Sequence, residues 1–230
     1  MGQQTLERAE TPQRRGRGFY LGAVLVVVGL GMLGYVGWQF LGTNIVAHHR
    51  QHEIVARTQR AWSAKAGATG TGSGDRLHGA QALIRIPRFG RSYVMPVQAG
   101  VSDQVLAEGF GHFDGTAGPG QRGNYALAAH RVTHGEPLRN MPELRPGDKV
   151  VVETRDRVYT YALDTNPNNL VVSFHDVWVI DPLPRNPVAG GVEPLQLRGR
   201  RLITLTTCAE LFHTDNRMVA FGHLVGSRHK

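Results

Sequence analysis

Cysteine is almost absent from this chain of 230 residues, which contains only Cys208. A single cysteine cannot close an intramolecular disulfide, so the protein is not a disulfide-stapled scaffold. Its composition is compatible with an oxidising compartment, because there is no second thiol to cross-link. A leftover thiol in such a compartment is either a buried bystander or a reactive group.

The sequence also lacks any block of Lys and Arg interleaved with aromatic residues. Its 26 Lys and Arg against 18 Asp and Glu give a net charge of +8, and this charge is scattered along the chain. Nucleic acid is therefore not an expected partner, because proteins that bind it gather their basic residues on one face or helix. A basic exterior also suits an anionic membrane or cell-wall surface.

Groups of residues that could hold a metal ion are scarce. Asp156, Asp164 and Asp181 are scattered and resemble turn residues. Three histidines fall at helical spacing within residues 48–52, but no Cys or carboxylate pattern supports them, and such a set usually forms a solvated face. We therefore expect neither a metal ion nor a cofactor.

One long run without charge is present, and it covers residues 19–40. As a helix it would be about 33 Å long, enough to cross a bilayer core. A cleaved signal peptide is the alternative, but it needs a shorter apolar core and a small-residue exit. The basic residues Arg14, Arg15 and Arg17 of the polar tail 1–18 favour a cytoplasmic N-terminus. We expect a single-pass anchor in the cell membrane with the rest of the chain outside the cell.

The segment 41–80 resembles a connection rather than a domain. Residues 43–62 could form a weak juxtamembrane helix, since their apolar residues are too sparse for a clear apolar face. Residues 63–80 are rich in Gly, Ser, Thr and Ala, which is typical of a flexible tether. We therefore expect residues 81–230 to form the extracellular catalytic domain.

Short β-prone runs separated by Gly, Pro, Asn and Asp fill the chain from residue 81 onward. The pattern indicates an all-β fold, and a closed barrel rather than a parallel sheet. Short helical segments are expected at 102–108, capped by Ser102, and at 137–144. The predicted strands are Ala82–Ile86, Asn124–His130, Lys149–Thr154, Val158–Leu163, Val177–Ile180, Leu202–Cys208 and Met218–Val225.

Three residues at the ends of these strands could form a thiol acyl-transfer site. Cys208 ends the run RLITLTTC, and His130 ends the run NYALAAH. Arg217 follows Cys208 by nine residues, so a strand, turn and strand would bring its guanidinium back beside the thiol. The three residue types can act as nucleophile, proton carrier and oxyanion partner. From spacing alone, a buried structural cysteine remains as good an interpretation.

Several segments together resemble the sortases, the membrane-anchored cysteine transpeptidases of Gram-positive bacteria. The sequence TLTTC is similar to the sortase cysteine motif, and it follows AAHRVTHGEPLRNMPELRPGDKVVVETRDRVYTY and FHDVWVIDPLP in sortase order. The resemblance covers roughly residues 81–225 and is strongest to class E. It implies an eight-stranded barrel. It also selects His130 over the rival histidines His134, His175, His213 and His223.

The resemblance implies a reaction and its partners. Cys208 would attack the Thr–Gly carbonyl of an LPxTG-like or LAxTG-like sorting signal in a secreted protein. Arg217 would stabilise the oxyanion, and His130 would protonate the leaving amine and later deprotonate the incoming one. The incoming amine would belong to a cell-wall precursor.

Further residues could line a groove for the peptide. Because side chains alternate along a strand, Thr206 and Cys208 share one face of their strand. We expect Thr206, Thr207, Tyr125 and Asn124 to contact substrate. Two alternatives stay open: a thiol hydrolase, in which water replaces the amine, and a membrane-tethered binding module with a structural cysteine.

Overall fold

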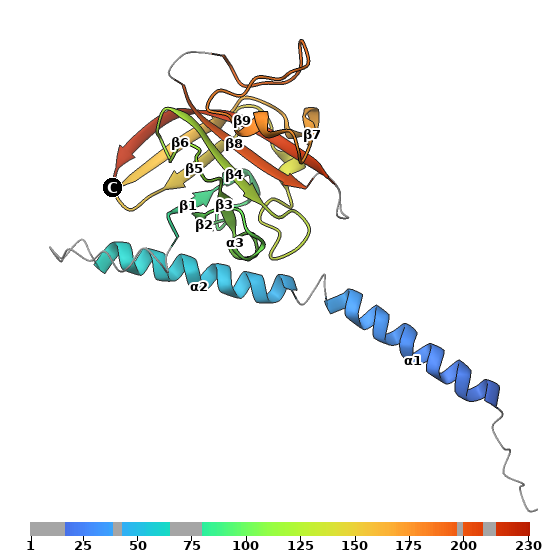
Figure 1. Cartoon of the computed structure of the whole chain (residues 1–230). Coiled ribbons are helices and arrows are strands. Elements are labelled where there is room, and N and C mark those ends of the chain that lie inside the picture. The colour runs from blue at the N-terminus through green and yellow to red at the C-terminus, as the bar shows by residue number, and fades with distance from the viewer. Residues whose placement is uncertain (1–16, 39–42, 65–79, 197–199, 209–214) are drawn as a thin grey trace, which may run out of the picture. The chain divides into compact units, whose positions relative to one another are not determined.

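The computed structural model describes residues 17–38, 43–64, 80–196, 200–208 and 215–230. The chain forms two compact units, Met1–Gln39 and Phe40–Lys230. The first unit contains helix α1 (Arg17–Gly37), drawn in dark blue in Figure 1. Its residues 18–37 have a mean hydropathy of 2.1, and none of them is buried, so they are long and apolar enough to cross a membrane. This span matches the predicted anchor, whose last two residues and most of the tail 1–18 lie outside the described residues.

The second unit contains a β-barrel (Figure 1). Eight strands form a ring in the order β6-β5-β1-β2-β3-β4-β8-β9, and a β6–β9 pairing closes it. The predicted closed eight-stranded barrel is confirmed. The bounds are β1 (Ala82–Arg85), β2 (Met95–Ala99), β3 (Phe110–His112), β4 (Gly123–Ala129), β5 (Lys149–Glu153), β6 (Arg157–Leu163), β8 (Arg201–Cys208) and β9 (Asn216–His229).

A ninth strand, β7 (Val171–Ser173), lies outside the ring and pairs with the first residues of β9. Sequence patterns did not predict β2, β3 or β7. Two of them have only three residues, and β2 contains Pro96, which weakens a strand pattern. Helix α3 (Asp103–Glu108) was predicted correctly, and Ser102 caps it by accepting a hydrogen bond from the Val105 amide. The short 3₁₀ helix η5 (Met141–Glu143) occupies part of the other predicted helical segment.

One predicted strand is wrong. Residues Val177–Ile180 form the 3₁₀ helix η7, although they are apolar and β-prone. The backbone of η7 is hydrogen-bonded by side chains of β4 and β8 instead of by a neighbouring strand. The Val179 carbonyl accepts hydrogen bonds from Asn124 Nδ2 at 3.1 Å and from Thr204 Oγ1 at 3.2 Å. Trp178 packs against Phe221 on the outer surface of the barrel, so the apolar run covers the barrel wall without joining it.

The barrel interior contains the main hydrophobic core. Alternate residues of each strand point inward, as the period of two requires, and Tyr125, Leu127, Ile203 and Leu205 are among those almost wholly buried. A second cluster covers the outer face of β9, where Val219 and Phe221 pack under η7 and β7. Strands β4, β8 and β9 are therefore covered on both faces along much of their length, which fixes their register.

Helix α2 (Thr43–Ala64) packs on the barrel and is not part of a detached tether. Its buried residues Ala47, Gln51, Val55 and Thr58 recur every three or four positions and so form one face. Val55 covers Leu83 of β1, which is completely buried. The compact unit therefore begins at Phe40 and includes the segment expected to connect the anchor to the domain. Most of the Gly-rich tether, residues 65–79, lies outside the described residues.

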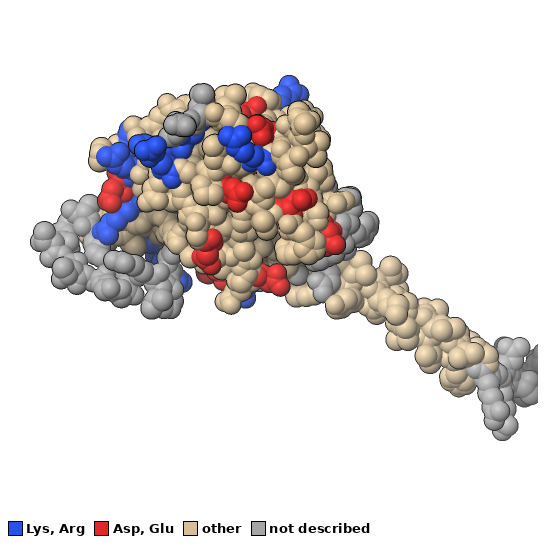
Figure 2. Space-filling view, turned by 45° about the horizontal axis from the view of Figure 1, so that its top comes forward, with Lys and Arg blue, Asp and Glu red and all other residues tan. Residues whose placement is uncertain are grey.

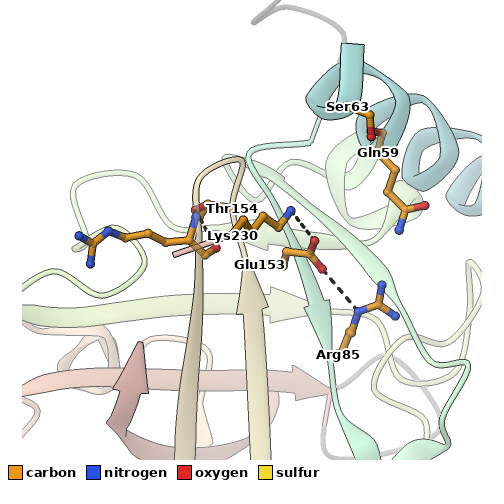
Figure 3. A network of polar contacts seen from close by, with 7 residues as sticks. Gln59, Ser63, Arg85, Glu153, Thr154 and Lys230 are labelled. Carbon is orange, nitrogen blue, oxygen red and sulfur yellow. Dashed lines mark hydrogen bonds and ion pairs between the residues drawn. The ribbon is translucent and has the colours of Figure 1, made fainter. Parts of the chain in front are cut away.

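The last turn of α2 faces the C-terminal end of β9. Figure 3 shows Gln59 and Ser63 of the helix opposite a polar network centred on Glu153. Glu153 forms ion pairs with Lys230 at 2.5 Å and with Arg85 at 3.6 Å (Figure 3). The Lys230 ammonium also lies 4.5 Å from the ring centre of Trp62. These contacts hold the end of α2 beside strands β1, β5 and β9.

Candidate active site

Three neighbouring strands bring the predicted catalytic positions to one end of the barrel. Strands β8 and β9 pair antiparallel, and Cys208 and Arg217 are directly opposite one another. Strands β4 and β8 run parallel, with Ala128 opposite Thr206. Two residues further along the chain lie His130, just after the end of β4, and Cys208, the last residue of β8. The three positions thus occupy adjacent strand ends in the order His130, Cys208, Arg217, although the chain separates the first two by 78 residues.

The backbone around His130 is fixed from both sides. The Thr207 hydroxyl donates a 2.7 Å hydrogen bond to the Ala129 carbonyl, which ties the residue before Cys208 to the residue before His130. After the strand, the Leu138 amide donates a 2.9 Å hydrogen bond to the His130 carbonyl. Leu138 is fully buried in the core, so it anchors the far side of the loop 131–138. The fixed backbone limits where the His130 ring can lie.

The ring of His134 stacks on the ring of His130. Their centres are 4.9 Å apart, and the ring planes differ by 28°. His134 Nδ1 is buried without a hydrogen-bond partner among the described residues. His134 was considered only as a rival for the proton-carrier role. Its place as a neighbour of His130 depends on the conformation of the loop, which sequence patterns did not predict.

Arg217 is the second residue of β9, opposite Cys208 of β8 on one side and Val172 of β7 on the other. Its guanidinium carbon is 5.5 Å from the ring centre of Phe174, and its Nη1 donates a 3.0 Å hydrogen bond to the Asn216 carbonyl. A cation held over an aromatic face retains its charge. Phe174 is 60% exposed and directly follows β7. Its contact with Arg217 depends on the pairing of β7 with β9, which sequence patterns did not predict.

The four predicted substrate contacts are all buried. Tyr125 belongs to the barrel core, and its neighbour His112 packs against its ring at 4.8 Å. Burial raises the pKa of the Tyr125 hydroxyl and lowers that of His112, so both stay neutral near pH 7. Asn124 is fully buried and donates to the carbonyls of Val179 and Asp181. Tyr125 and Asn124 therefore do not line an open groove.

The two threonines also have structural contacts. Thr206 is 6% exposed and Thr207 is 3% exposed, and the Thr207 hydroxyl is engaged by Ala129. The side chain of Thr207 thus links the ends of β4 and β8, and its hydroxyl proton is used within the barrel. The partly exposed residue of this face is Ala128, opposite Thr206 on β4. Ala126, two residues earlier on the same face of β4, is fully buried, so this face is partly exposed only near the end of the strand.

The rival histidines differ in their distance from Cys208. His223 is opposite Leu202, six residues before Cys208 and about 20 Å from it along β8 at roughly 3.3 Å per residue. It contacts Asp164, with Nδ1 2.6 Å from a carboxylate oxygen. His175 follows β7 and packs against Phe174. His213 lies outside the described residues.

A cleft of about 830 Å³ lies elsewhere, between the end of α2 and the end of β9. Its lining includes Trp62, Glu153, Asp156 and Lys230, and none of the predicted catalytic residues. Among the described residues no group of three His, Cys, Asp or Glu side chains could hold a metal ion. Figure 2 shows basic and acidic groups interspersed with broad uncharged areas on the face that it presents, in agreement with the scattered charge of the sequence.

The chain is similar to several known proteins. It is 36% identical over 220 residues to sortase SrtE1 of Streptomyces coelicolor, an alignment that covers 90% of this chain and 57% of that protein. The chain thus spans a little over half of that relative. It also resembles the structure of sortase E from Streptomyces avermitilis, with 39% identity, a TM-score of 0.57, and coverage of 65% of this chain and 90% of that one.

A third structure, that of sortase E1 from S. coelicolor with a tripeptide in its active site, gives a TM-score of 0.56 at 35% identity and covers 65% of this chain and 90% of that one. Residues 84–225 match the sortase domain, and this region contains the strand ends with His130, Cys208 and Arg217. The match extends over more than half of the chain, and the barrel agrees with it. The chain therefore belongs to the sortase family.

Proposed function

We propose that this chain is a membrane-anchored cysteine transpeptidase with His130, Cys208 and Arg217 as its catalytic residues. The observation that carries the proposal is the register of β4, β8 and β9, which brings these three positions to adjacent strand ends. Members of the sortase family are cysteine transpeptidases, and the relatives described above are class E sortases.

In this mechanism the Cys208 thiolate attacks the carbonyl carbon of a Thr–Gly bond in an LPxTG-like or LAxTG-like sorting signal. The carbonyl oxygen becomes an oxyanion, and the planar guanidinium of Arg217 donates N–H groups to it. His130 gives a proton to the leaving glycine amine, and a thioester to Cys208 remains. The tripeptide bound in the active site of the S. coelicolor relative supports a peptide substrate for this chain.

The second half of the reaction transfers the acyl group to an amine. His130 removes a proton from the incoming amine, which attacks the thioester and expels Cys208. We propose that the amine belongs to a cell-wall precursor and that the acyl donor is a secreted protein. Helix α1 would hold the enzyme in the membrane with its N-terminus inside the cell and its barrel outside.

Incubating the purified chain with LAxTG and LPxTG peptides and an amine, followed by mass spectrometry, tests the proposal. Transpeptidation gives a product cleaved after Thr with the amine attached. Cleavage with addition of water alone would favour the thiol hydrolase. The Cys208→Ala variant should give neither product and should fold normally, whereas residual activity above about a few per cent of wild type would remove Cys208 from the nucleophile role.

Arg217→Lys separates charge from geometry at the oxyanion. An ammonium retains the positive charge but loses the planar set of donors. We expect the single-turnover rate of thioester formation to fall by about 10²–10³, the usual effect of losing one oxyanion donor. A near-normal rate in Arg217→Lys would reduce the role of Arg217 to its charge, and a near-normal rate in Arg217→Ala would exclude it from the mechanism.

A further inference from the structure

The loop that follows His130 contains three consecutive residues with left-handed backbone conformations. The φ angles are 53° at His134, 77° at Gly135 and 49° at Glu136. Glycine adopts this region readily, but His and Glu do so at a cost. Non-glycine residues persist in such conformations only where surrounding contacts determine them, and these sites often have a functional role.

Helix α2 supplies contacts to each of the three residues. Gln51 Nε2 donates a 3.0 Å hydrogen bond to the His134 carbonyl. Asn44 Oδ1 accepts a 2.9 Å hydrogen bond from the Gly135 amide, and Asn44 Nδ2 donates a 3.1 Å hydrogen bond to Glu136 Oε1. The contacts join parts of the chain that are more than 80 residues apart in sequence, and Gln51 is 2% exposed.

The three hydrogen bonds come from two residues of α2 and together clamp the loop 134–136 against the helix. Asn44 and Gln51 are seven residues apart, two helical turns, and so lie on the same face of α2. A Cβ atom built on Gly135 would lie 2.6 Å from the Gln51 amide atoms, which means that the loop backbone and the helix side chain are in close contact. The loop cannot shift toward α2, and its hydrogen bonds oppose movement away from it.

The held loop directs His134 toward the proposed catalytic histidine. Its ring stacks on that of His130 at 4.9 Å, while its Nδ1 has no hydrogen-bond partner among the described residues. The clamped backbone and ring packing thus fix the His134 ring. We propose that Asn44 and Gln51 of α2 act through His134 as positioning residues for His130, so that the helix after the membrane anchor is part of the active-site architecture. This inference rests on the proposed function.

The experiment uses the full chain in detergent and two variants that each remove one hydrogen bond made by a buried side chain of α2. Gln51→Met removes the donor to the His134 carbonyl. Thr58→Val is the matched control, because Thr58 lies on the same buried face but accepts its hydrogen bond from the Ala80 amide, at 3.2 Å, and not from the loop 134–136. We expect kcat on a sorting-signal peptide to fall by about tenfold or more in Gln51→Met, since misplacement of a catalytic group by about 1 Å can cost about 10²-fold. KM should stay within about twofold, and Thr58→Val should match wild type.

Two substitutions at His134 separate its ring from its backbone. His134→Asn retains a residue that tolerates the left-handed region but removes the ring, and should lower kcat as Gln51→Met does. His134→Phe returns a ring without an ionisable group and should regain most of the rate. If His134→Phe were as inactive as His130→Asn, His134 would itself carry protons and the positioning role would be overturned.

A second measurement does not depend on turnover. The ring resonance of His130 in a proton–carbon NMR spectrum should move in Gln51→Met and His134→Asn, because the stacked ring changes its shielding, and should remain in place in Thr58→Val. Equal effects of Gln51→Met and Thr58→Val on both kcat and this resonance would overturn the proposal. A wild-type chain that fails to turn over peptide would contradict the proposed function alone, since the resonance would still decide the positioning role.

Discussion

Helices α1 and α2 are consecutive and almost equal in length, at 21 and 22 residues, but they are opposite in composition and burial. The apolar helix α1 has no buried residue in its spanning segment, whereas the polar helix α2 has a buried face. Low mean hydropathy therefore does not prevent α2 from packing on the barrel. An uncharged surface all round suits a lipid environment, and a narrow stripe with specific polar contacts suits a protein surface.

The two helices also differ in the contacts that their residues make. No residue of the α1 segment 18–37 is buried, and a Cβ built on its glycines meets no atom within 4 Å apart from the backbone of the helix itself and the chain neighbours. Helix α2 covers Leu83 with Val55 and reaches the loop 134–136 with Asn44 and Gln51. We infer that α1 determines location and that α2 supports both the stability of the barrel and the position of His130.

Two truncations, one without α1 and one without both helices, should show the largest difference in stability and activity. A chain that starts at residue 40 should fold and act on soluble peptides like the full chain, because α1 belongs to a separate compact unit. A chain that starts at residue 81 exposes Leu83 and loses the Ala80 contact to Thr58. It should lose at least about 1.5–3 kcal/mol, the value of burying one large aliphatic side chain, together with most of its activity. Equal melting temperatures and activities for the two truncations would show that α2 is only a connection.

A buried charge on α2 should have the next largest effect. Val55→Asp puts a carboxylate against Leu83 without a described partner and should destabilise the barrel by several kcal/mol. Val46→Asp makes the same change on the same helix at a position that is 43% exposed, and should change stability by less than about 0.5 kcal/mol. Urea unfolding of both variants measures the difference, and similar midpoints would contradict the assigned buried face.

Gly135→Ala tests the contact between α2 and the loop with a smaller expected effect. The substitution costs about 1–2 kcal/mol for its left-handed backbone, and its Cβ also meets Gln51 at 2.6 Å. Gly147→Ala is the control, because Gly147 has a φ of 91° and no atom within 4 Å of its built Cβ. Gly135→Ala should be the more destabilising of the two in chemical unfolding. Adding Gln51→Ala should recover part of that difference, whereas simple additivity would argue against a direct contact.

A substitution in α1 should have the smallest effect. Gly29→Ala adds a methyl group that meets no described atom within 4 Å apart from the backbone of its own helix and its chain neighbours. The melting temperature of the barrel and kcat on a soluble peptide should both equal those of wild type, within about 0.5 kcal/mol for stability. A lower kcat in detergent would mean that α1 is coupled to the active site and that the two helices differ less than we infer.

The catalytic roles of Cys208, His130 and Arg217 stay predictions, which rest on residue type, on chain order and, for His130, on the resemblance to sortases. Cys208 is the only thiol, His130 and Cys208 end β-prone runs, and Arg217 begins a run after a short polar loop. The groove residues were chosen from adjacency to these positions, and that reasoning did not hold for Tyr125 and Asn124. Alternation along a strand tells which side chains share a face, but not whether the face is covered, and η7 covers the side that Asn124 occupies.

The sequence by itself determined the elements with strong local signals. An uncharged apolar run defines α1, alternating β-prone runs define most of the barrel, and Ser102 defines the start of α3. Only the tertiary structure decided that Val177–Ile180 turns as a 3₁₀ helix, that α2 packs through Gln51 and Thr58, and that His134 stacks on His130. These features depend on contacts between residues far apart in the chain, and local patterns contain no information about such partners.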